Sequence, residues 1–220
     1  MDLDFSDIAY DDFFAKISSD TLVLTVTDRM YRHLFAKYMH YQSRENSINC
    51  MHINFKSLNA WKENLWINFC LEYDLPNILD NAQIKYIWEN FLLDHSNSKN
   101  MLYPSSCLKQ LLQAWQYVIQ WQCDLEFTLW FEQKIVNDQV NMFIDIVNNF
   151  REDAAIRGFI SPVEMLGEII NVVKSIAGNK DEYVKFSKII PNNIILVGFE
   201  KSTPEIEELL SLLKSLGVSY

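Results

Sequence analysis

The stretch Thr21-Leu-Val-Leu-Thr-Val26, followed directly by Thr27-Asp-Arg-Met30, decides how the rest of the chain can be interpreted. Its first six residues are apolar or β-branched and bounded by polar residues, a pattern that predicts a short buried strand. Thr27 or Asp28 can cap a following helix. The apolar face of that helix would consist of Met30, Leu34, Phe35, Tyr38 and Met39. A strand, a tight turn and an amphipathic helix together form a building unit of parallel sheets.

Two more apolar runs predict strands farther along the chain. Cys50–Phe55 is followed by Ser57, which can cap a helix carrying Trp61 and Trp66, and Ile194–Val197 is followed by a helix that starts near Pro204. Short, fully apolar strands joined through helices indicate a parallel sheet covered on both faces. We therefore expect an α/β fold with a small parallel sheet and a large all-helical insertion. The expected α/β parts are residues 1–60 and 181–220, and the expected insertion is 61–180.

The expected insertion shows almost only helical periodicity. Asp80-x-x-Gln83 and Ser161-Pro-x-Glu164 have the form of capping boxes, and the proline suits the first position of a helix. Most of the six tryptophans fall on apolar faces of the predicted helices, which favours core packing over base stacking. The tryptophans are Trp61, Trp66, Trp88, Trp115, Trp121 and Trp130.

The distribution of glycine excludes a phosphate-binding loop in the first two thirds of the chain. Such a loop needs glycines so that backbone N–H groups can wrap phosphate oxygens, and a lysine that reaches the β- and γ-phosphates. The chain has five glycines, and the first is Gly158. ATP hydrolysis by this chain is therefore not expected, and no cofactor is predicted.

The charge is negative overall but uneven along the chain. The net charge is −10, residues 1–20 carry −5, and residues 21–60 carry +3. Because phosphate binding draws mainly on lysine and arginine, a DNA contact would have to lie in the basic segment. Arg29, Arg32 and Lys56 are the candidate DNA contacts. The alternative is a solvated charged helix face without a ligand.

Other chemistries find little support in the residue spacing. The histidines and the four cysteines are scattered without a zinc-type pattern, which favours a reducing compartment and predicts no metal site. We find neither an apolar run long enough for a membrane helix nor a secretory signal, so no membrane partner and a cytoplasmic location are expected.

Four stretches, in order, resemble parts of AddB-like and RecC-like DNA-repair proteins. Thr25-Val-Thr-Asp-Arg-Met-Tyr-Arg32 is similar to their strand-to-helix turn, with Val26 and Thr27 in place of the usual proline and asparagine. Ser57-Leu-Asn-Ala-Trp61 is similar to the helix after their second strand. Arg157-Gly-Phe-Ile-Ser-Pro162 and Leu196-Val-Gly-Phe-Glu-Lys-Ser-Thr-Pro204 resemble two later elements of the family.

The resemblance implies a helicase-like domain of the P-loop class, inactivated at its nucleotide site, in a DNA-repair helicase–nuclease subunit. By that resemblance Thr25, Asp28, Arg29 and Arg32 occupy the degenerate nucleotide-loop region, and Glu200 is the remnant of the acidic motif. The chain alone would be non-catalytic. It would act as a scaffold within a longer helicase or exonuclease and would contact DNA. Its partners would be DNA, the further C-terminal domains, or a partner helicase subunit.

Two other interpretations remain open at this stage. The chain could be a mostly helical protein-interaction module without a nucleic-acid role, or an ATPase with an unconventional loop that depends on Glu200. A parallel sheet built from 21–26, 50–55 and 194–197 favours the helicase-like interpretation, whereas an all-helical fold favours the interaction module.

Overall fold

The computed structural model describes residues 5–45, 53–94, 104–123, 138–179, 183, 186–187 and 189–220. The chain divides into two compact units, which we describe separately. The sheet unit comprises Met1–Glu72, Ile169–Ser202 and Leu209–Tyr220, and the helical unit comprises Tyr73–Glu168 and Thr203–Glu208. The first boundary lies after the expected 60/61, because the helix that follows the second strand contacts the sheet and groups with it. The second lies before the expected 180/181, since Ile169–Ser202 also belongs to the sheet unit.

The centre of the sheet unit is a three-stranded parallel sheet in the order β2-β1-β5. Its strands are β1 (Thr21–Thr25), β2 (Asn54–Ser57) and β5 (Asn193–Val197). Val23 of β1 pairs in register with Phe55 on one side and with Ile195 on the other. The predicted parallel sheet is confirmed. Its second strand begins later than the predicted Cys50, and residues 50–52 lie outside the described part of the chain.

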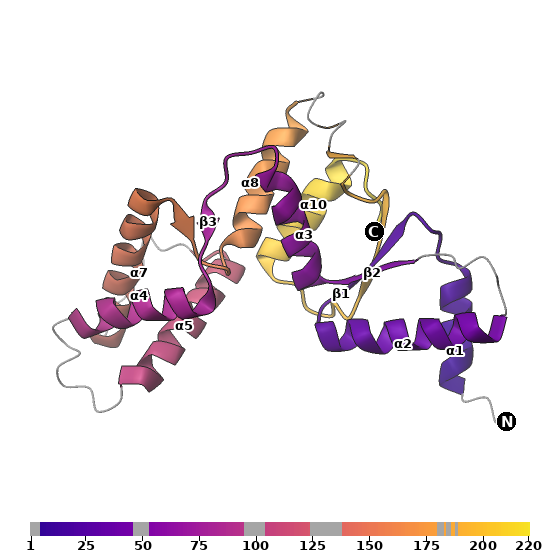
Figure 1. Cartoon of the computed structure of the whole chain (residues 1–220), viewed down its shortest axis with the longest axis horizontal. Helices are drawn as coiled ribbons and strands as arrows, with labels where there is room; N and C mark the ends of the chain where they lie inside the picture. The colour runs from indigo at the N-terminus through magenta and orange to yellow at the C-terminus, as the bar shows by residue number, and fades with distance from the viewer. Residues whose placement is uncertain are drawn as a thin grey trace. The chain divides into compact units, whose positions relative to one another are not determined.

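Helices cover both faces of this sheet (Figure 1). On one face α1 (Phe5–Ala15) and α2 (Asp28–Glu45) pack over Val23 and Phe55, which share a buried cluster with Leu34 of α2. Because side chains alternate along a strand, Leu22 and Leu24 point to the other face, and both are 1% exposed. There α3 (Leu58–Cys70) contacts β1 and β2. Burial on both faces explains why β1 is a continuous apolar run.

The apolar face expected for α2 is only partly correct. Leu34 and Tyr38 are buried, but Phe35 is 40% exposed and Met39 is 50% exposed. The side of α2 that packs on the sheet is a stripe of residues four apart, which consists of Met30, Leu34 and Tyr38. Phe35 lies beside this stripe and contacts the rings of Tyr31 and Phe55.

The helical unit is built from α4 (Asn81–Asp94), α5 (Pro104–Gln120) and α7 (Asp138–Arg157) around an aromatic core. Trp88, Trp115 and Phe150 are at most 1% exposed, and their rings contact one another. A two-stranded parallel sheet of β3 (Asn77–Ile78) and β4 (Phe159–Ile160) adjoins this core. Sequence reasoning did not predict these strands.

Of the two predicted capping boxes, the one at Asp80 is complete, and the one at Ser161 forms only one of its two hydrogen bonds. The Asp80 N–H donates to Gln83 Oε1 at 2.8 Å and the Gln83 N–H to Asp80 Oδ1 at 2.7 Å, at the start of α4. The Ser161 N–H donates to Glu164 Oε2 at 2.9 Å, but α8 (Met165–Ala177) begins three residues after the predicted Pro162. The reason is a tight turn in which the Glu164 N–H donates to the Ser161 carbonyl.

The remaining sequence predictions concern the last helix, the tryptophans and the membrane. Helix α10 (Pro204–Ser215) begins where predicted. Four tryptophans are buried as expected, whereas Trp121 is 54% exposed and Trp130 lies outside the described residues. None of the described helices is long and apolar enough to cross a bilayer. The buried tryptophans are Trp61, Trp66, Trp88 and Trp115.

Candidate functional site

The carboxyl ends of the three parallel strands form the edge where an α/β sheet usually binds its ligand. Thr25, Ser57 and Val197 end the three strands and are aligned in register. The chain continues from β1 to β2 on one side and returns to β5 on the other, so β1 lies where the strand order reverses. This edge is therefore the position to examine for a nucleotide site.

The turn between β1 and α2 is short and hydrogen-bonded internally. Only Val26 and Thr27 separate the two elements. Thr25 is fully buried, and its hydroxyl donates to the carbonyls of Thr27 at 3.1 Å and Lys56 at 3.4 Å. The Val26 N–H donates to the Val197 carbonyl at 3.2 Å. Two residues cannot wrap a phosphate as a P-loop does, because that motif has four residues between its glycines alone.

Thr27 closes the amino end of α2 from within the chain. Its hydroxyl accepts a hydrogen bond from the Met30 N–H at 3.2 Å, and its carbonyl accepts one from the Tyr31 N–H at 3.0 Å. Free N–H groups at a helix start are what binds an anion. Of the two expected capping residues, Thr27 and Asp28, it is Thr27 that caps the helix. A phosphate would have to displace the Thr27 hydroxyl to bind the Met30 N–H.

The Met30 side chain fills the space beside the end of β5. Gly198 follows β5 with φ of +84°, and a Cβ built on it would lie 2.6 Å from Met30 Sδ and 3.2 Å from Val26 Cγ1. Glycine is therefore required here both by its backbone angle and by the closeness of methionine. The strand ends are packed by apolar atoms where a nucleotide site would need polar donors.

The residues assigned by resemblance divide into buried and exposed groups. Thr25 is buried in the turn, whereas Asp28, Arg29 and Arg32 are exposed on the first turn and a half of α2. Glu200 is exposed three residues after the end of β5. The carboxylate of Asp28 suits the positive end of the helix dipole, which is a structural role.

One exposed side of α2 carries basic groups over three turns. Arg29, Arg32, His33 and His40, which we call the basic face, lie opposite the buried Leu34 and Tyr38. The Arg29 side chain makes no ion pair or hydrogen bond within the described residues, and Arg32 Nε donates to the Asp28 carbonyl at 3.3 Å. These guanidinium groups are free to meet an anion in solution.

Other cations near the basic face are engaged by α1. Arg44 Nη2 lies 2.5 Å from Asp11 Oδ1, and Lys37 Nζ lies 5.7 Å from the centre of the Tyr10 ring. The Tyr10 hydroxyl also lies 3.5 Å from His33 Nε2. Asp11 of α1 therefore pairs with Arg44 near the carboxyl end of α2, whereas Arg29 near its amino end has no ion pair within the described residues.

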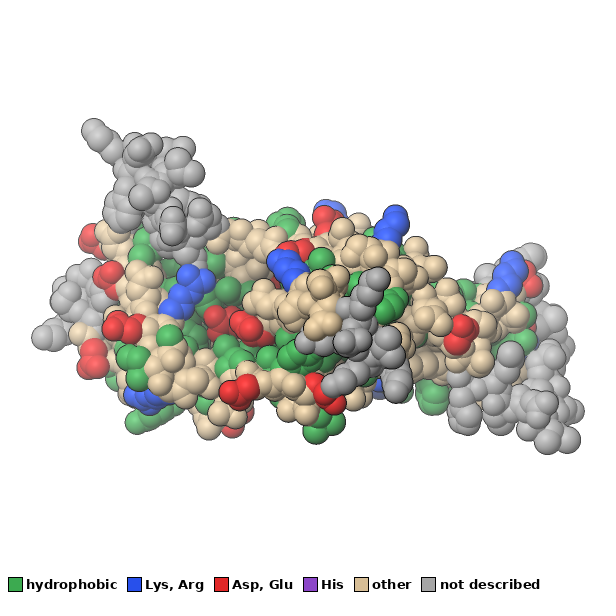
Figure 2. Space-filling view, turned by 90° about the horizontal axis from the view of Figure 1, so that it is seen from above, with side chains coloured by type: hydrophobic (Ala, Val, Ile, Leu, Met, Phe, Trp, Pro, Cys, Tyr) green, Lys and Arg blue, Asp and Glu red, His purple; other side chains and the backbone are tan. Residues whose placement is uncertain are grey.

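Lys56 does not join Arg29 and Arg32. Phe55 points toward α2, so the alternation of side chains along β2 turns Lys56 to the opposite face of the sheet. Figure 2 shows one face of the molecule, on which the described Lys and Arg side chains stand singly among acidic and apolar ones. Lys56 therefore does not extend the basic face of α2.

The described residues hold no group of three or more His, Cys, Asp or Glu side chains that could bind a metal ion. Cys70, Cys107 and Cys123 are free thiols, and burial raises the pKa of Cys107. A raised pKa keeps the thiol protonated and unreactive. His52, His95 and Cys50 lie outside the described residues.

Sequence reasoning missed one feature, a cavity in the helical unit lined by Trp115 and two lysines. Its residues come from α4, α5 and the turn before α8. No sequence motif marks it, because the tryptophan occupies an ordinary position on the apolar face of a helix.

No protein-family model matches this chain, and no curated protein shows significant sequence similarity to it.

Proposed function

We propose that this chain is a helicase-like domain without nucleotide hydrolysis, which scaffolds a DNA-processing protein and contacts DNA through the basic face of α2. The observation that carries the proposal is the parallel sheet, in which β1 lies between β2 and β5. The same three segments were required by the helicase-like interpretation, whereas an all-helical interaction module would lack them.

The absence of hydrolysis in this proposal is supported by the closed strand ends. A phosphate would need several free N–H donors and a nearby lysine at the turn after β1. At that turn the Thr25 and Thr27 hydroxyls are both hydrogen-bonded to the backbone, and Met30 occupies the space beside Gly198. An ATPase that uses Glu200 would have to open this packing first.

The DNA contact in this proposal is supported by the charge distribution on α2. Arginine binds phosphate through a planar array of donors, and Arg29 and Arg32 are one turn apart on an exposed surface. The remaining chain is acidic, so binding would be local and weak at physiological salt. Single-stranded DNA is the simplest probe of such a contact.

The test is the salt dependence of binding to a fluorescent single-stranded oligonucleotide, measured by anisotropy. Since each phosphate contact contributes about 0.7 to the slope of log K against log salt, Arg29→Ala with Arg32→Ala should reduce the magnitude of the slope by about 1.4. The control is Arg157→Ala with Lys201→Ala, which removes two exposed charges elsewhere. Absence of binding at low salt would refute the DNA contact and leave only the scaffold role.

A protein partner is the second candidate for α2. Phe35 and Met39 lie one turn apart and are 40% and 50% exposed, next to the basic face. Exposed apolar side chains beside charged ones are common at protein interfaces. A Phe35→Ser and Met39→Ser variant that binds DNA normally but no longer co-purifies with the native partner would favour this candidate.

A further inference from the structure

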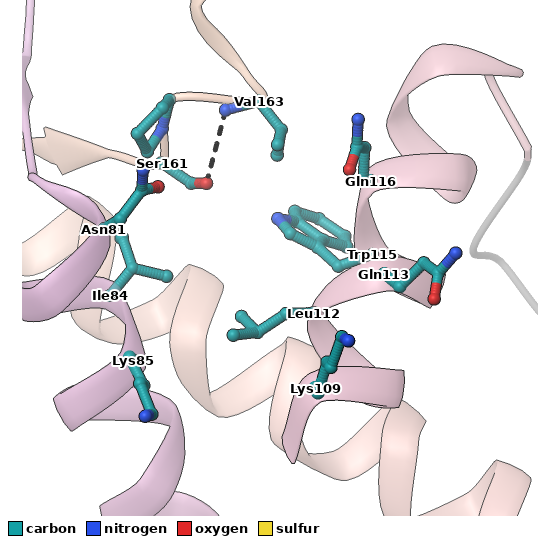
Figure 3. Close-up of a pocket in the computed structure, with 11 residues that line it drawn as sticks. Asn81, Ile84, Lys85, Lys109, Leu112, Gln113, Trp115, Gln116, Ser161 and Val163 are labelled. Atoms are coloured by element: carbon teal, nitrogen blue, oxygen red, sulfur yellow. Dashed lines mark hydrogen bonds between the residues drawn. The ribbon is translucent and has the colours of Figure 1, made fainter. Parts of the chain in front are cut away.

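The helical unit contains a cavity of about 620 Å³, which is in the size range of small-molecule sites. It lies between α4, α5 and the turn that precedes α8 (Figure 3). Ile84, Leu112 and Val163 give it apolar walls. The cavity shares no residue with the basic face of α2, so ligand binding in it would be independent of the proposed DNA contact.

One wall of the cavity carries a buried hydrogen-bond donor without a partner. Trp115 is 1% exposed, and its Nε1 makes no hydrogen bond with any of the described residues. In Figure 3 this nitrogen is turned toward the space between Val163 and Leu112. Buried polar groups are nearly always paired, so an unpaired donor directed into a cavity indicates an acceptor that is still to be supplied.

The indole of Trp115 is held in a fixed orientation. The Arg151 guanidinium lies 5.1 Å from the centre of its ring, and the rings of Trp88 and Phe150 are 6.2 and 6.4 Å away. A donor fixed by contacts on several sides loses little freedom when it binds, which favours binding. Trp88 Nε1 is also unpartnered, but Trp88 does not line the cavity.

The charged residues that line the cavity are all positive. Lys85 and Lys109 are exposed and line it, and none of its lining residues is an aspartate or glutamate. Neither lysine has an ion-pair partner within the described residues. In a chain with a net charge of −10, this is a local excess of positive charge, and it would attract the anionic end of a ligand.

The geometry points to a binding site for a small organic carboxylate, whose apolar body enters the cavity and carries a neutral acceptor for the Trp115 N–H. The apolar body contacts Ile84, Leu112 and Val163, and the carboxylate is held at the mouth by Lys85 and Lys109. Three parts of the ligand are thereby specified: the anion, the apolar body and one further oxygen or nitrogen acceptor.

Three naphthalenes test these parts one at a time on the full chain. Methoxynaphthoate has the anion, the body and the acceptor, naphthoate lacks the acceptor, and methoxynaphthalene lacks the anion. Affinities are measured by calorimetry, and the Trp115 indole N–H is followed by ¹⁵N NMR. We expect methoxynaphthoate to bind most tightly, to shift the Trp115 resonance to saturation, and to exceed naphthoate by about threefold to tenfold, the range of one hydrogen bond.

Two pairs of variants locate the interactions. Trp115→Phe should abolish the advantage of methoxynaphthoate over naphthoate, whereas Trp88→Phe, which removes an equally buried N–H, should preserve it. Lys85→Gln with Lys109→Gln should weaken both acids by roughly fivefold, as expected for two exposed ion pairs, and leave the neutral compound unchanged. Lys201→Gln is the control for loss of positive charge.

Three results would contradict the proposed carboxylate site. A Trp115 resonance that does not move at millimolar probe would mean that water satisfies the donor, and the proposal would be wrong. Equal effects of Trp115→Phe and Trp88→Phe, or equal affinity for the neutral compound and the acids, would also overturn it. Circular dichroism of each variant, unchanged from the parent, assigns the losses to the site rather than to unfolding.

Discussion

The edge of the sheet in the sheet unit and the cavity in the helical unit differ in how their polar groups are satisfied. At the edge, the Thr25 and Thr27 hydroxyls are hydrogen-bonded within the turn, and Met30 packs against Gly198. In the cavity, the Trp115 N–H is buried without a partner. The fold class predicts a ligand at the edge of the sheet, but the unpaired donor lies in the cavity of the helical unit.

The largest effect that bears on this comparison concerns the core that fixes Trp115. Phe150 is fully buried and contacts the rings of Trp88, Trp115 and Phe159. Phe150→Ala should lower the free energy of unfolding of the helical unit by about 3–5 kcal/mol, because it leaves a cavity among aromatic rings. Urea denaturation followed by circular dichroism measures this change.

Ile156→Ala on the same helix is the control for Phe150→Ala. Ile156 is 77% exposed, so its replacement should change stability by less than about 0.5 kcal/mol. Equal losses for the two variants would show that the aromatic core does not hold the cavity wall, and the contrast between the two regions would fail.

A smaller effect is expected at the closed edge of the sheet. Gly198→Ala places a Cβ 2.6 Å from Met30 Sδ at a backbone φ of +84°, and we expect a loss of about 1–3 kcal/mol from strain at this position. Thermal and urea unfolding measure it. Gly178→Ala is the matched control, because a Cβ there meets only ordinary contacts. If both variants are equally stable, the edge is looser than described and could admit a ligand.

The smallest effect concerns the pH dependence of the capping box beside the cavity. Burial raises the pKa of Glu164 above its ordinary value of 4.5, against smaller opposing effects of the Ser161 N–H and Arg151. A raised carboxyl pKa stabilises the fold fully below 4.5, and this contribution is lost as the pH rises through the folded-state pKa. Stability should therefore fall with rising pH in that window.

Glu164→Gln removes this titration while keeping an acceptor for the Ser161 N–H, as Gln83 does for Asp80. The variant should match the parent in acid and be more stable at neutral pH, by less than about 1 kcal/mol. Melting temperatures across this pH range measure the difference, with the exposed Glu152→Gln as control. A parent that loses stability relative to the variant on acidification would reverse the assigned sign.

The sequence specifies the central strand of the sheet well because β1 is buried on both faces. Leu22, Val23 and Leu24 form a continuous apolar run for that reason, and Ser57 caps the next helix with its hydroxyl. The short strands β3 and β4 were not predicted, because two residues show no periodicity. The exposure of Met39 was not predicted either, because helical periodicity does not show how wide a side of α2 the sheet covers.

The sequence allowed predictions for the turn after β1 and for α2, but none for the cavity. The lack of glycines near the turn after β1 predicts no phosphate loop there, and in the structure this turn has two residues and is hydrogen-bonded internally. The positions of Arg29 and Arg32 on one exposed face also follow from helical spacing. Whether the N–H of Trp115 finds a partner depends on tertiary packing with residues about 45 positions away, such as Val163, so no local pattern could show it.

The most direct test of the central proposal is a ¹⁵N NMR titration of the full chain with single-stranded DNA at low ionic strength. We expect progressive shifts of the backbone amides of α2 and of the Arg29 and Arg32 side-chain N–H groups, with the buried amides of Thr25 and Ser57 unchanged. Shifts concentrated at the strand ends, or no shift in α2, would contradict a domain that is closed at its nucleotide edge and binds DNA through α2.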